Sequence, residues 1–350
     1  MSTNSLKLGL STGLLSGKSK LSDALENVKE AERLGFDSIW SSETYGSDAL
    51  TPRAWWGSQT EKVRLGTSII QISARRPPTT AMAAMTMDHL SGGRFMLGLG
   101  VSGPQVVEGW YGEPFAKPLA RTREYVSIVR DVIARREPVT SAGPHYPLPV
   151  SGREGITGLA KPLRSILHPL RERIPIYIAA EGPKNIALAA EIGDGWLPLY
   201  YSPYYDAELY RPCLEEGFAR RGVAPEDFEI APSVPLIVDD DIERAADVLR
   251  PMYALYFGGM GARNMNFHHQ VIVRMGYGAV AKKIQDLYLD GKKDEAAAAV
   301  PTKLVEELAL IGPADKIRHD LEVWRESPVT TILIAGPAER LRQAAELVLG

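Results

Sequence analysis

The sequence predicts an α/β protein built as a parallel (β/α)8 barrel, a TIM barrel. Short apolar segments alternate with amphipathic helical segments eight times along the 350 residues. This alternation is typical of parallel strands joined by right-handed crossovers. Eight strands close a barrel, and single barrels commonly exceed 250 residues. An open, doubly wound sheet remains the alternative architecture.

The individual elements follow from apolar runs and from helix start and stop signals. In the segment 22–35, for example, Leu25, Val28 and Leu34 share one helical face and Gly35 can end the helix. The expected strands cover 6–12, 36–43, 63–72, 94–103, the two ends of 174–202, 229–240 and 329–336. The expected helices cover 22–35, 52–61, 78–93, 119–135, the middle of 174–202, 242–257, 313–327 and 337–349.

Two stretches lie outside this repeat. Residues 137–173 are rich in Pro, Gly and His, and residues 258–304 combine glycines with a helical stretch. Both are expected to be insertions in barrel loops, as loops or short helices, so the sequence predicts one domain over 1–350.

Composition narrows the function classes. The formal charge of −3 gives no reason to expect nucleic acid or an anionic membrane as a partner. The single cysteine, Cys213, excludes an internal disulfide and fits a reducing compartment. No apolar run reaches the 18 residues of a membrane span. We therefore expect a cytoplasmic protein.

The run "GLGVSG", Gly98 to Gly103, has the G-x-G-x-x-G spacing of a dinucleotide-binding turn. That fingerprint belongs to the first strand–helix turn of a Rossmann fold. Here three strand–helix units come first, and Pro104 follows the third glycine. We interpret the glycines as making room for a ligand or a neighbouring backbone.

In a barrel, chemistry is expected at the carboxyl ends of the strands. These ends show no close acid pair, and the adjacent His268 and His269 lack metal-ligand spacing, so we expect no metal site. An enzyme that has neither an acid pair nor a metal site at its strand ends often relies on an organic cofactor for its chemistry. The residues at the strand ends are Thr12, Glu43, Ser68 to Gln71, Ser102, Gly103, Ala180 to Gly182, Tyr200 and Tyr201.

The segment "AAEGPKNIALAAEIGDG" carries a more specific signal. A strand runs directly into Gly182, and Pro183 stands at the first position of an amphipathic helix. The N–H groups at such a helix start, with Lys184 and Asn185 beside them, suit an anion such as phosphate. A plain capped turn with a solvated lysine is the alternative.

Several segments carry a family resemblance: 35–43, 64–104, 175–198 and 311–324. With them, the chain resembles the bacterial luciferase-like superfamily of flavin-dependent and deazaflavin (coenzyme F-420)-dependent oxidoreductases, which are TIM barrels. The run "HLSGGRFMLGLGVSGPQVVEGWYG" is similar to the actinobacterial F-420-dependent branch.

This resemblance implies roles for particular residues. Ser68 and Ile69 match a non-prolyl cis peptide behind the ring system of the cofactor, and Ser102 and Gly103 match the loop that lines the ring. The turn that matches the phosphate site comprises Ala180, Glu181, Gly182, Pro183, Lys184 and Asn185. Thr12 and Arg121 are further candidates for cofactor contact. Arg121 and Arg123 match a region where relatives place a basic residue near the phosphate. A solvated helix face is the alternative for both arginines.

Glu43 is the candidate catalytic residue, because relatives keep a polar or acidic residue beside the ring at this point. It could bond the cofactor, move a proton or only cap the following loop. The pairs Trp55–Trp56 and Trp110–Tyr111 could line a substrate pocket, or belong to the core or a subunit interface.

The resemblance implies an F-420-dependent oxidoreductase that transfers a hydride between C5 of the deazaflavin and a small organic substrate, and a homodimer is expected. An FMN-dependent luciferase-like monooxygenase is the alternative. A non-catalytic carrier of F-420 or flavin is a second alternative, since fold alone does not establish turnover.

Overall fold

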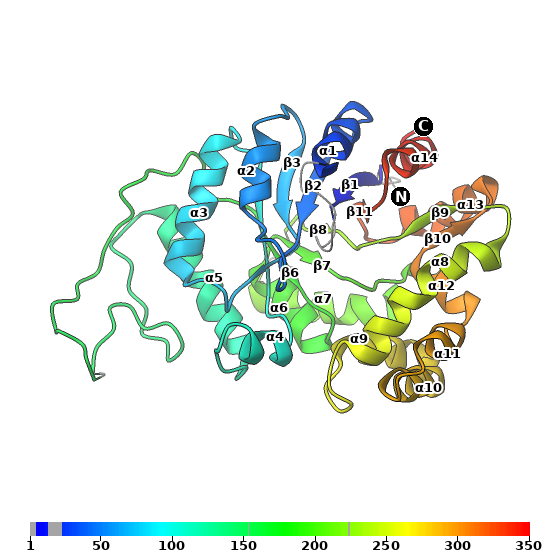
Figure 1. The fold of residues 1–350 in the computed structure, drawn as a ribbon. Helices are drawn as coiled ribbons and strands as arrows, with labels where there is room; N and C mark the ends of the chain where they lie inside the picture. Colours follow the sequence, from blue (N-terminus) through cyan, green and yellow to red (C-terminus); the bar gives the residue numbers. More distant parts are fainter. Residues whose placement is uncertain (1–4, 13–22, 153, 223–224) are drawn as a thin grey trace.

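The computed structural model describes residues 5–12, 23–152, 154–222 and 225–350, and in these residues eight parallel strands enclose a barrel (Figure 1). The strand order is β11-β1-β2-β3-β5-β6-β7-β8. Backbone bonds close the ring, because Val234 N donates to Leu333 O (2.9 Å) and Leu333 N donates to Pro232 O (2.8 Å). The barrel fold is therefore confirmed. Its strands are β1 (Lys7–Ser11), β2 (Ser38–Ser41), β3 (Arg64–Thr67) continued by β4 (Ile70–Gln71), β5 (Phe95–Gly100), β6 (Ile176–Ala179), β7 (Gly195–Leu197), β8 (Glu229–Ile230) and β11 (Thr331–Ile334).

One expected strand is divided in two. The run 229–240 forms β8 and a separate β9 (Leu236–Val238), with Pro232 and Pro235 between them. Proline has no N–H to donate to a sheet ladder, so the pairing changes partner at this point. β9 pairs with β10 (Leu310–Gly312), a strand that the sequence did not predict.

The helices surround the barrel, as Figure 1 shows. Most agree with the sequence prediction, but α4, which begins at Pro104 directly after the glycine run, was not expected. The α-helices are α1 (Asp23–Arg33), α2 (Thr51–Gly57), α3 (Pro77–Leu90), α4 (Pro104–Gly109), α5 (Pro118–Ala134), α6 (Pro183–Ile192), α7 (Arg211–Arg221), α8 (Ile242–Ala254), α9 (Phe267–Ile272), α10 (Gly278–Leu289), α11 (Lys293–Ala298), α12 (Thr302–Leu308), α13 (Ala314–Glu326) and α14 (Ala338–Val348). Shorter 3-10 and π turns are η1 (Pro203–Tyr205), η2 (Asp206–Tyr210), η3 (Leu255–Gly259) and η4 (Val273–Tyr277).

The two stretches outside the repeat differ from each other. The stretch 258–304 holds α9 to α11 and begins α12. The described part of 137–173 has isolated bridges, Val139 with Leu163 and Ser141 with Leu148, but no helix or sheet strand. None of the described helices is long and apolar enough to cross a membrane.

A compact apolar cluster fills the barrel interior. It consists of Trp40, Met96, Tyr177, Leu197, Ala231 and Leu333, with Ile69 and Ala179 packed against it. The glycines of β5 make this packing possible. A Cβ on Gly98 would lie 1.7 Å from Thr67 O, and one on Gly100 would lie 2.8 Å from Ile69 Cδ1. The interpretation that these glycines admit a neighbouring backbone is confirmed at Gly98.

Candidate active site

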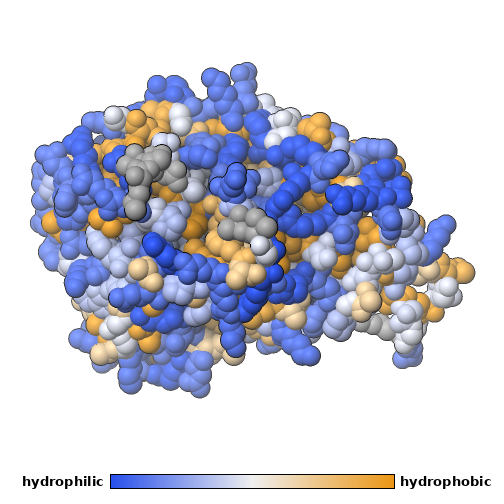
Figure 2. All heavy atoms as spheres, turned by 180° about the vertical axis from the view of Figure 1, so that it is seen from behind, coloured by the Kyte–Doolittle hydropathy of each residue, from blue (hydrophilic) through white to orange (hydrophobic). Residues whose placement is uncertain are grey.

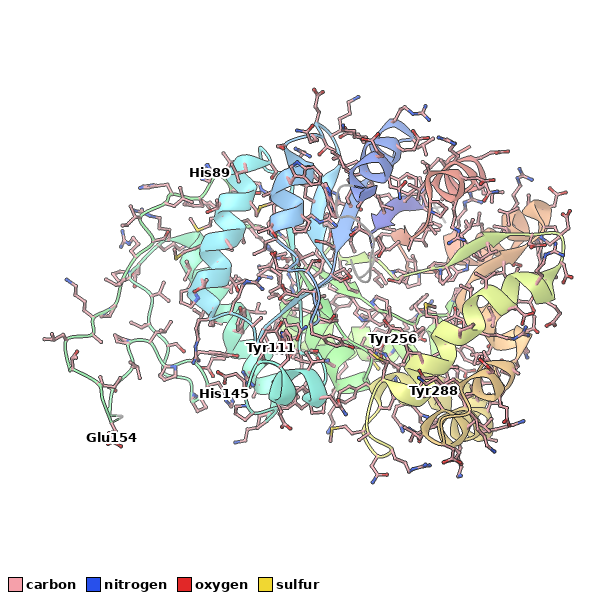
Figure 3. All side chains as sticks on the ribbon, viewed as in Figure 1. His89, Tyr111, His145, Glu154, Tyr256 and Tyr288 are labelled. Carbon is pink, nitrogen blue, oxygen red and sulfur yellow. The ribbon has the colours of Figure 1, made fainter. Side chains whose placement is uncertain are left out.

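The candidate site is the barrel mouth, where the strands end. Figure 3 places Tyr111 and Tyr256 at this end of the barrel, beside α4 and α9. The loops that follow β2, β3, β5, β6 and β7 all open here, so the structure brings together residues that are far apart in the sequence.

The break between β3 and β4 forms part of the floor of this mouth. The peptide bond between Ser68 and Ile69 is cis, as predicted. Ile69 O accepts a hydrogen bond from Glu43 N (3.2 Å), and the Ile69 side chain packs on the interior cluster beside Gly100. The floor is therefore apolar and held by the adjacent β2 loop.

Both carboxylate oxygens of Glu43 are engaged in contacts within the chain. Its side chain is 4% exposed and pairs with Arg75, whose Nη1 lies 2.7 Å and 3.0 Å from the two carboxylate oxygens. The same oxygens accept from Gln71 N (3.1 Å) and Ala49 N (3.2 Å). Of the roles that the sequence left open, this geometry favours holding the loop.

The turn after β6 has the features of an anion cradle. Gly182 precedes α6 in an extended conformation, and no atom lies within 4 Å of the position that its Cβ would occupy. Asn185 Oδ1 is buried and has no hydrogen-bond partner among the described residues, so this oxygen can accept a hydrogen bond from a hydroxyl group of a ligand but does not itself attract an anion. Pro183 and Lys184 are exposed, and Ala180 is buried, with its carbonyl accepting from Trp196 Nε1 (2.8 Å). Pro183 has no N–H and Asn185 N donates to Gly182 O (2.9 Å), so what this turn offers a phosphate is the open space beside Gly182 and the positive end of the helix dipole.

Glu181 meets two side chains from the 258–304 stretch. His268 Nδ1 lies 2.8 Å from Glu181 Oε2, and Arg274 Nη2 donates to Glu181 O (2.6 Å). Burial lowers the pKa of His268, but the charge of Glu181 and the contact with it outweigh burial, so the pKa is raised. The rings of Tyr200 and Tyr256 pack edge-on against the imidazole. In the sequence, His268 is a candidate only for metal binding, and nothing in the spacing between positions 181 and 268 indicates that the two side chains meet.

Of the other expected cofactor residues, three lie at strand ends and one, Arg121, lies on helix α5. Thr12 directly follows β1 at the mouth, where its N and Oγ1 both donate to Trp40 O (2.9 Å and 3.0 Å). Ser102 has a left-handed φ of 59° and Gly103 caps α4. Arg121, by contrast, donates to Pro114 O (2.7 Å) and to Tyr146 Oη (3.2 Å).

Aromatic side chains form a rim around the mouth. The rings of Trp110 and Tyr45 lie 6.4 Å apart, and those of Phe115 and Phe267 lie 6.3 Å apart. Tyr111 Oη donates to Thr44 O (3.1 Å). The pair Trp110–Tyr111 is therefore at the mouth. On α2, Trp56 is buried in the core, whereas Trp55 is partly exposed.

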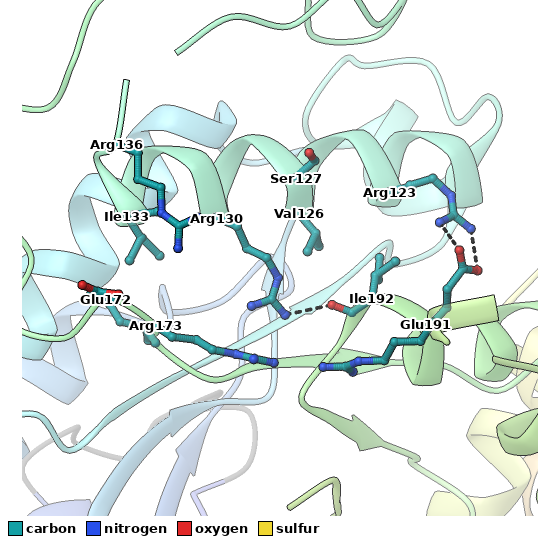
Figure 4. Close-up of a pocket in the computed structure, with 13 residues that line it drawn as sticks. Arg123, Val126, Ser127, Arg130, Ile133, Arg136, Glu172, Arg173, Glu191 and Ile192 are labelled. Atoms are coloured by element: carbon teal, nitrogen blue, oxygen red, sulfur yellow. Dashed lines mark hydrogen bonds and ion pairs between the residues drawn. The ribbon is translucent and has the colours of Figure 1, made fainter. Parts of the chain in front are cut away.

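A cavity of about 670 Å³ lies on the outer wall between α5 and α6 (Figure 4). Arg130 and Arg221, which line it, share the carboxylate of Asp194 at 3.0 Å and 3.6 Å, and Arg123 pairs with Glu191. These ion pairs join α5 and α7 to Glu191 at the end of α6 and to Asp194 directly after it. The cavity is away from the strand ends, and we do not assign the active site to it. In the described ranges, no group of three or more His, Cys, Asp or Glu side chains could hold a metal ion.

Comparisons with known proteins identify the family. Residues 5–331 match the family of luciferase-like monooxygenases. The chain belongs to this family. It is 55% identical over 346 residues to a Mycobacterium tuberculosis protein that is named as a coenzyme F-420-dependent oxidoreductase, and the match covers 98% of this chain and 99% of that protein.

More distant relatives agree on the fold. A 5,10-methylenetetrahydromethanopterin reductase of Archaeoglobus fulgidus is 26% identical over 311 residues, which cover 89% of this chain and 88% of that protein. The structure of the coenzyme F-420-dependent tetrahydromethanopterin reductase of Methanopyrus kandleri superposes with a TM-score of 0.77 at 22% identity, covering 98% of each chain.

Proposed function

We propose that this protein is a coenzyme F-420-dependent oxidoreductase that transfers a hydride between C5 of the deazaflavin and a small organic substrate. The observation that carries the proposal is the 55% identity, over nearly the whole of both chains, to a protein named for this activity. We further propose that all 350 residues act as one domain, in a cytoplasmic homodimer.

The mouth supplies what this cofactor would need. Ser68 and Ile69 would support the ring system from the barrel floor, and Thr12, Ser102 and Gly103 would lie around its edge. The turn from Ala180 to Asn185 would hold the phosphate in the open space beside Gly182, at the positive end of the helix dipole. When bound, the deazaflavin accepts or donates the hydride.

The chain's own residues would position and shield the reactants. Glu43 would keep the β3–β4 break in place through Ile69 O and Gln71 N. The aromatic rim of Tyr45, Trp110 and Phe267 would exclude water from the reacting atoms and favour an apolar part of the substrate.

The test is a pair of fluorescence titrations of the purified protein with F-420 and with FMN, at low and high salt. F-420 carries a lactyl-oligoglutamate tail beyond its phosphate. The exposed Lys184, and Arg121 where its half-buried guanidinium can reach the tail, would each add about 1 kcal/mol or less. We expect F-420 to bind roughly tenfold to hundredfold more tightly than FMN, with high salt reducing this preference.

Anaerobic mixing with reduced F-420 and a panel of organic acceptors then separates the alternatives. Oxidation of the reduced cofactor that depends on both protein and acceptor supports the oxidoreductase. Micromolar binding of FMN without binding of F-420 would contradict the proposal and favour the monooxygenase. Binding of F-420 without turnover would leave the carrier as an open alternative.

A further inference from the structure

Glu181 and His268 form a largely buried titratable pair at the barrel mouth, and their side chains have no role in the cofactor site described above. His268 Nδ1 lies 2.8 Å from Glu181 Oε2, and the two side chains are 22% and 12% exposed. Apart from this contact, neither oxygen of the carboxylate has a hydrogen-bond partner in the described part of the chain. Burying an unpaired carboxylate is costly, so Glu181 favours a protonated imidazole beside it.

The other ring nitrogen of His268 is free for a ligand. No residue of the described ranges hydrogen-bonds His268 Nε2, and this atom is not among the buried polar atoms that lack a partner, so it faces open space. Because Nδ1 is held towards a carboxylate, the Nε2–H is the proton that the charged ring can give away. The neutral ring that remains keeps its Nδ1–H towards Glu181.

The pair stands beside the floor on which the cofactor ring is proposed to lie. A Cβ on Gly100 would lie 2.9 Å from Ile69 Cγ1 and 3.4 Å from Ala179 Cβ, so Ile69 and Ala179 both border this point of β5. Glu181 follows Ala179 by two residues, just beyond the end of β6. The imidazole that Glu181 contacts is therefore next to the ring site and not on the outer wall.

Neighbouring segments fix the position of the imidazole. The rings of Tyr200, after β7, and Tyr256, in η3, pack edge-on against it with centroids 5.7 Å and 5.1 Å away. Asn266 fixes the start of α9, because its Oδ1 accepts from His269 N (3.0 Å) and its Nδ2 donates to Tyr256 O (2.9 Å). These contacts leave the imidazole little freedom to turn away from Glu181.

The charged groups around His268 are Glu181 and Arg274, whose Nη2 donates to the backbone O of Glu181 (2.6 Å). Burial raises the pKa of the phenols of Tyr200 and Tyr256, so both phenols stay neutral. Hydrophilic side chains cover most of the face of the molecule seen in Figure 2, and a histidine on such a surface is ionised by solvent alone. At His268 a single carboxylate holds the proton.

Reduction of a carbonyl group needs a proton as well as a hydride, because the hydride alone would leave an alkoxide. A positioned acid typically accelerates such a step by about 10²–10⁴. Two other titratable groups at the mouth are engaged elsewhere, since Glu43 pairs with Arg75 and Tyr111 Oη donates to Thr44 O (3.1 Å). His268 Nε2 is the donor that the fold leaves open.

We propose that His268 is the acid–base residue of the hydride transfer, and that the substrate is a carbonyl compound or the corresponding alcohol. As the hydride forms a C–H bond at the carbonyl carbon, the C=O π electrons move to the oxygen, which takes the proton from Nε2. The hydride carries two electrons from the reduced cofactor, the carbonyl becomes an alcohol, and water reprotonates the imidazole. This inference rests on the proposed function and adds a substrate class and a catalytic residue to it.

The first experiment needs no cofactor. NMR of protein labelled with ¹³C-histidine follows the six histidines as the pH changes, and the signal lost in His268→Gln identifies His268. We expect a pKa above the ordinary value of about 6.5, and a lower one in Glu181→Gln. The signal of His319, whose side chain is 81% exposed, should not differ between the two proteins. A His268 pKa that Glu181→Gln leaves unchanged would overturn the proposal.

The second experiment measures turnover. Reduced F-420 is mixed anaerobically with acetone, cyclohexanone or benzaldehyde, and its oxidation is followed between pH 6 and pH 10. The wild-type rate should fall as the pH rises through the pKa of His268, and in Glu181→Gln the fall should begin at lower pH. His268→Gln should lower the rate about a hundredfold or more and remove this pH dependence. The matched control is His269→Gln, the next position on α9, which should retain the wild-type rate.

A His268→Gln variant with the wild-type rate and pH profile would contradict the catalytic role. An equal loss of rate in His269→Gln would also contradict it, because the cause would then be a disturbed helix. F-420 that binds but is not oxidised by any of these carbonyl compounds would refute the substrate class and leave the proposed function standing. A wild type that fails to bind F-420 in the fluorescence titration would instead refute the proposed function, and this proposal with it.

Discussion

Glu43 was the candidate catalytic residue, and its surroundings make a prediction about stability. Replacing it by Gln removes the charge that pairs with Arg75 while that guanidinium is mostly buried. Breaking a buried pair from one side costs about 3 kcal/mol. We expect Glu43→Gln to lower the free energy of unfolding by about that amount in urea denaturation.

The matched control is the double variant Glu43→Met with Arg75→Met, which removes both charges and should be more stable than either single variant. If Glu43→Gln instead keeps wild-type stability and loses only turnover, a direct catalytic role for Glu43 would be established.

His268 predicts a pH dependence. Because Glu181 raises the pKa of His268 in the folded protein, the protonated imidazole is favoured by folding. This stabilisation is complete below the ordinary pKa of about 6.5 and is lost as the pH rises through the raised value. We expect His268→Gln to lower the unfolding free energy more at pH 6 than at pH 9.

Urea denaturation at the two pH values measures the effect. The control is His319→Gln on α13, whose side chain is 81% exposed, and it should show no such difference. Equal destabilisation by His268→Gln at both pH values would show that the pair with Glu181 does not hold a proton.

At the scale of elements, the start of α6 predicts that a substitution there can weaken F-420 binding without destabilising the fold. Gly182 has φ −84° and ψ 149°, a conformation open to any residue, and a new Cβ would meet no atom. Gly182→Val should therefore leave thermal stability nearly unchanged. If the cofactor phosphate approaches this turn, the branched side chain should weaken F-420 binding by roughly tenfold or more, since each 1.4 kcal/mol is a factor of ten.

Gly182→Ala provides the graded comparison and should have a smaller effect in the same fluorescence titration. Unchanged affinity in the Val variant would place the phosphate elsewhere.

At the scale of the whole molecule, an ion-pair network closes the end of the barrel opposite the mouth. Arg64 of β3 donates to both oxygens of Glu229 of β8 (3.0 Å each) and through Nε to Asp37 (3.0 Å), and Tyr177 Oη of β6 donates to Glu229 (2.8 Å). Burial raises the pKa of Glu229, but Arg64, with Lys7 and Tyr177, outweighs burial and lowers it.

A lowered pKa stabilises the fold above the ordinary value of about 4.3, and this contribution is lost as the pH falls through the lowered value. Glu229→Gln should cost about 3 kcal/mol at pH 7, because it breaks a largely buried pair. The difference from the wild type in urea denaturation should shrink towards pH 3. A difference that stays constant with pH would show that packing, and not charge, is responsible.

Much of the fold could be predicted from the order of residues in the chain. The barrel class followed from the alternation of apolar runs and helices, and the start of α6 at Pro183 followed from a local motif. The cis bond between Ser68 and Ile69 was expected only from the family resemblance. The predicted limits of strands and helices were wrong where local sequence signals conflict. Pro232 and Pro235 divided an apolar run, β10 is too short to show a period, and α4 has only six residues.

What the sequence by itself determined is the set of elements and the strand ends at which chemistry is expected, because periodicity and caps are properties of neighbours in the chain. Only the tertiary structure decided which of those residues are free to contact a ligand and which are engaged in contacts within the chain. It committed Glu43 to Arg75, joined Glu181 to His268 across 87 positions, and left the apolar residues 156–170 without a core. Contacts of this kind depend on how loops from distant strands meet in space, and no spacing within the chain encodes them.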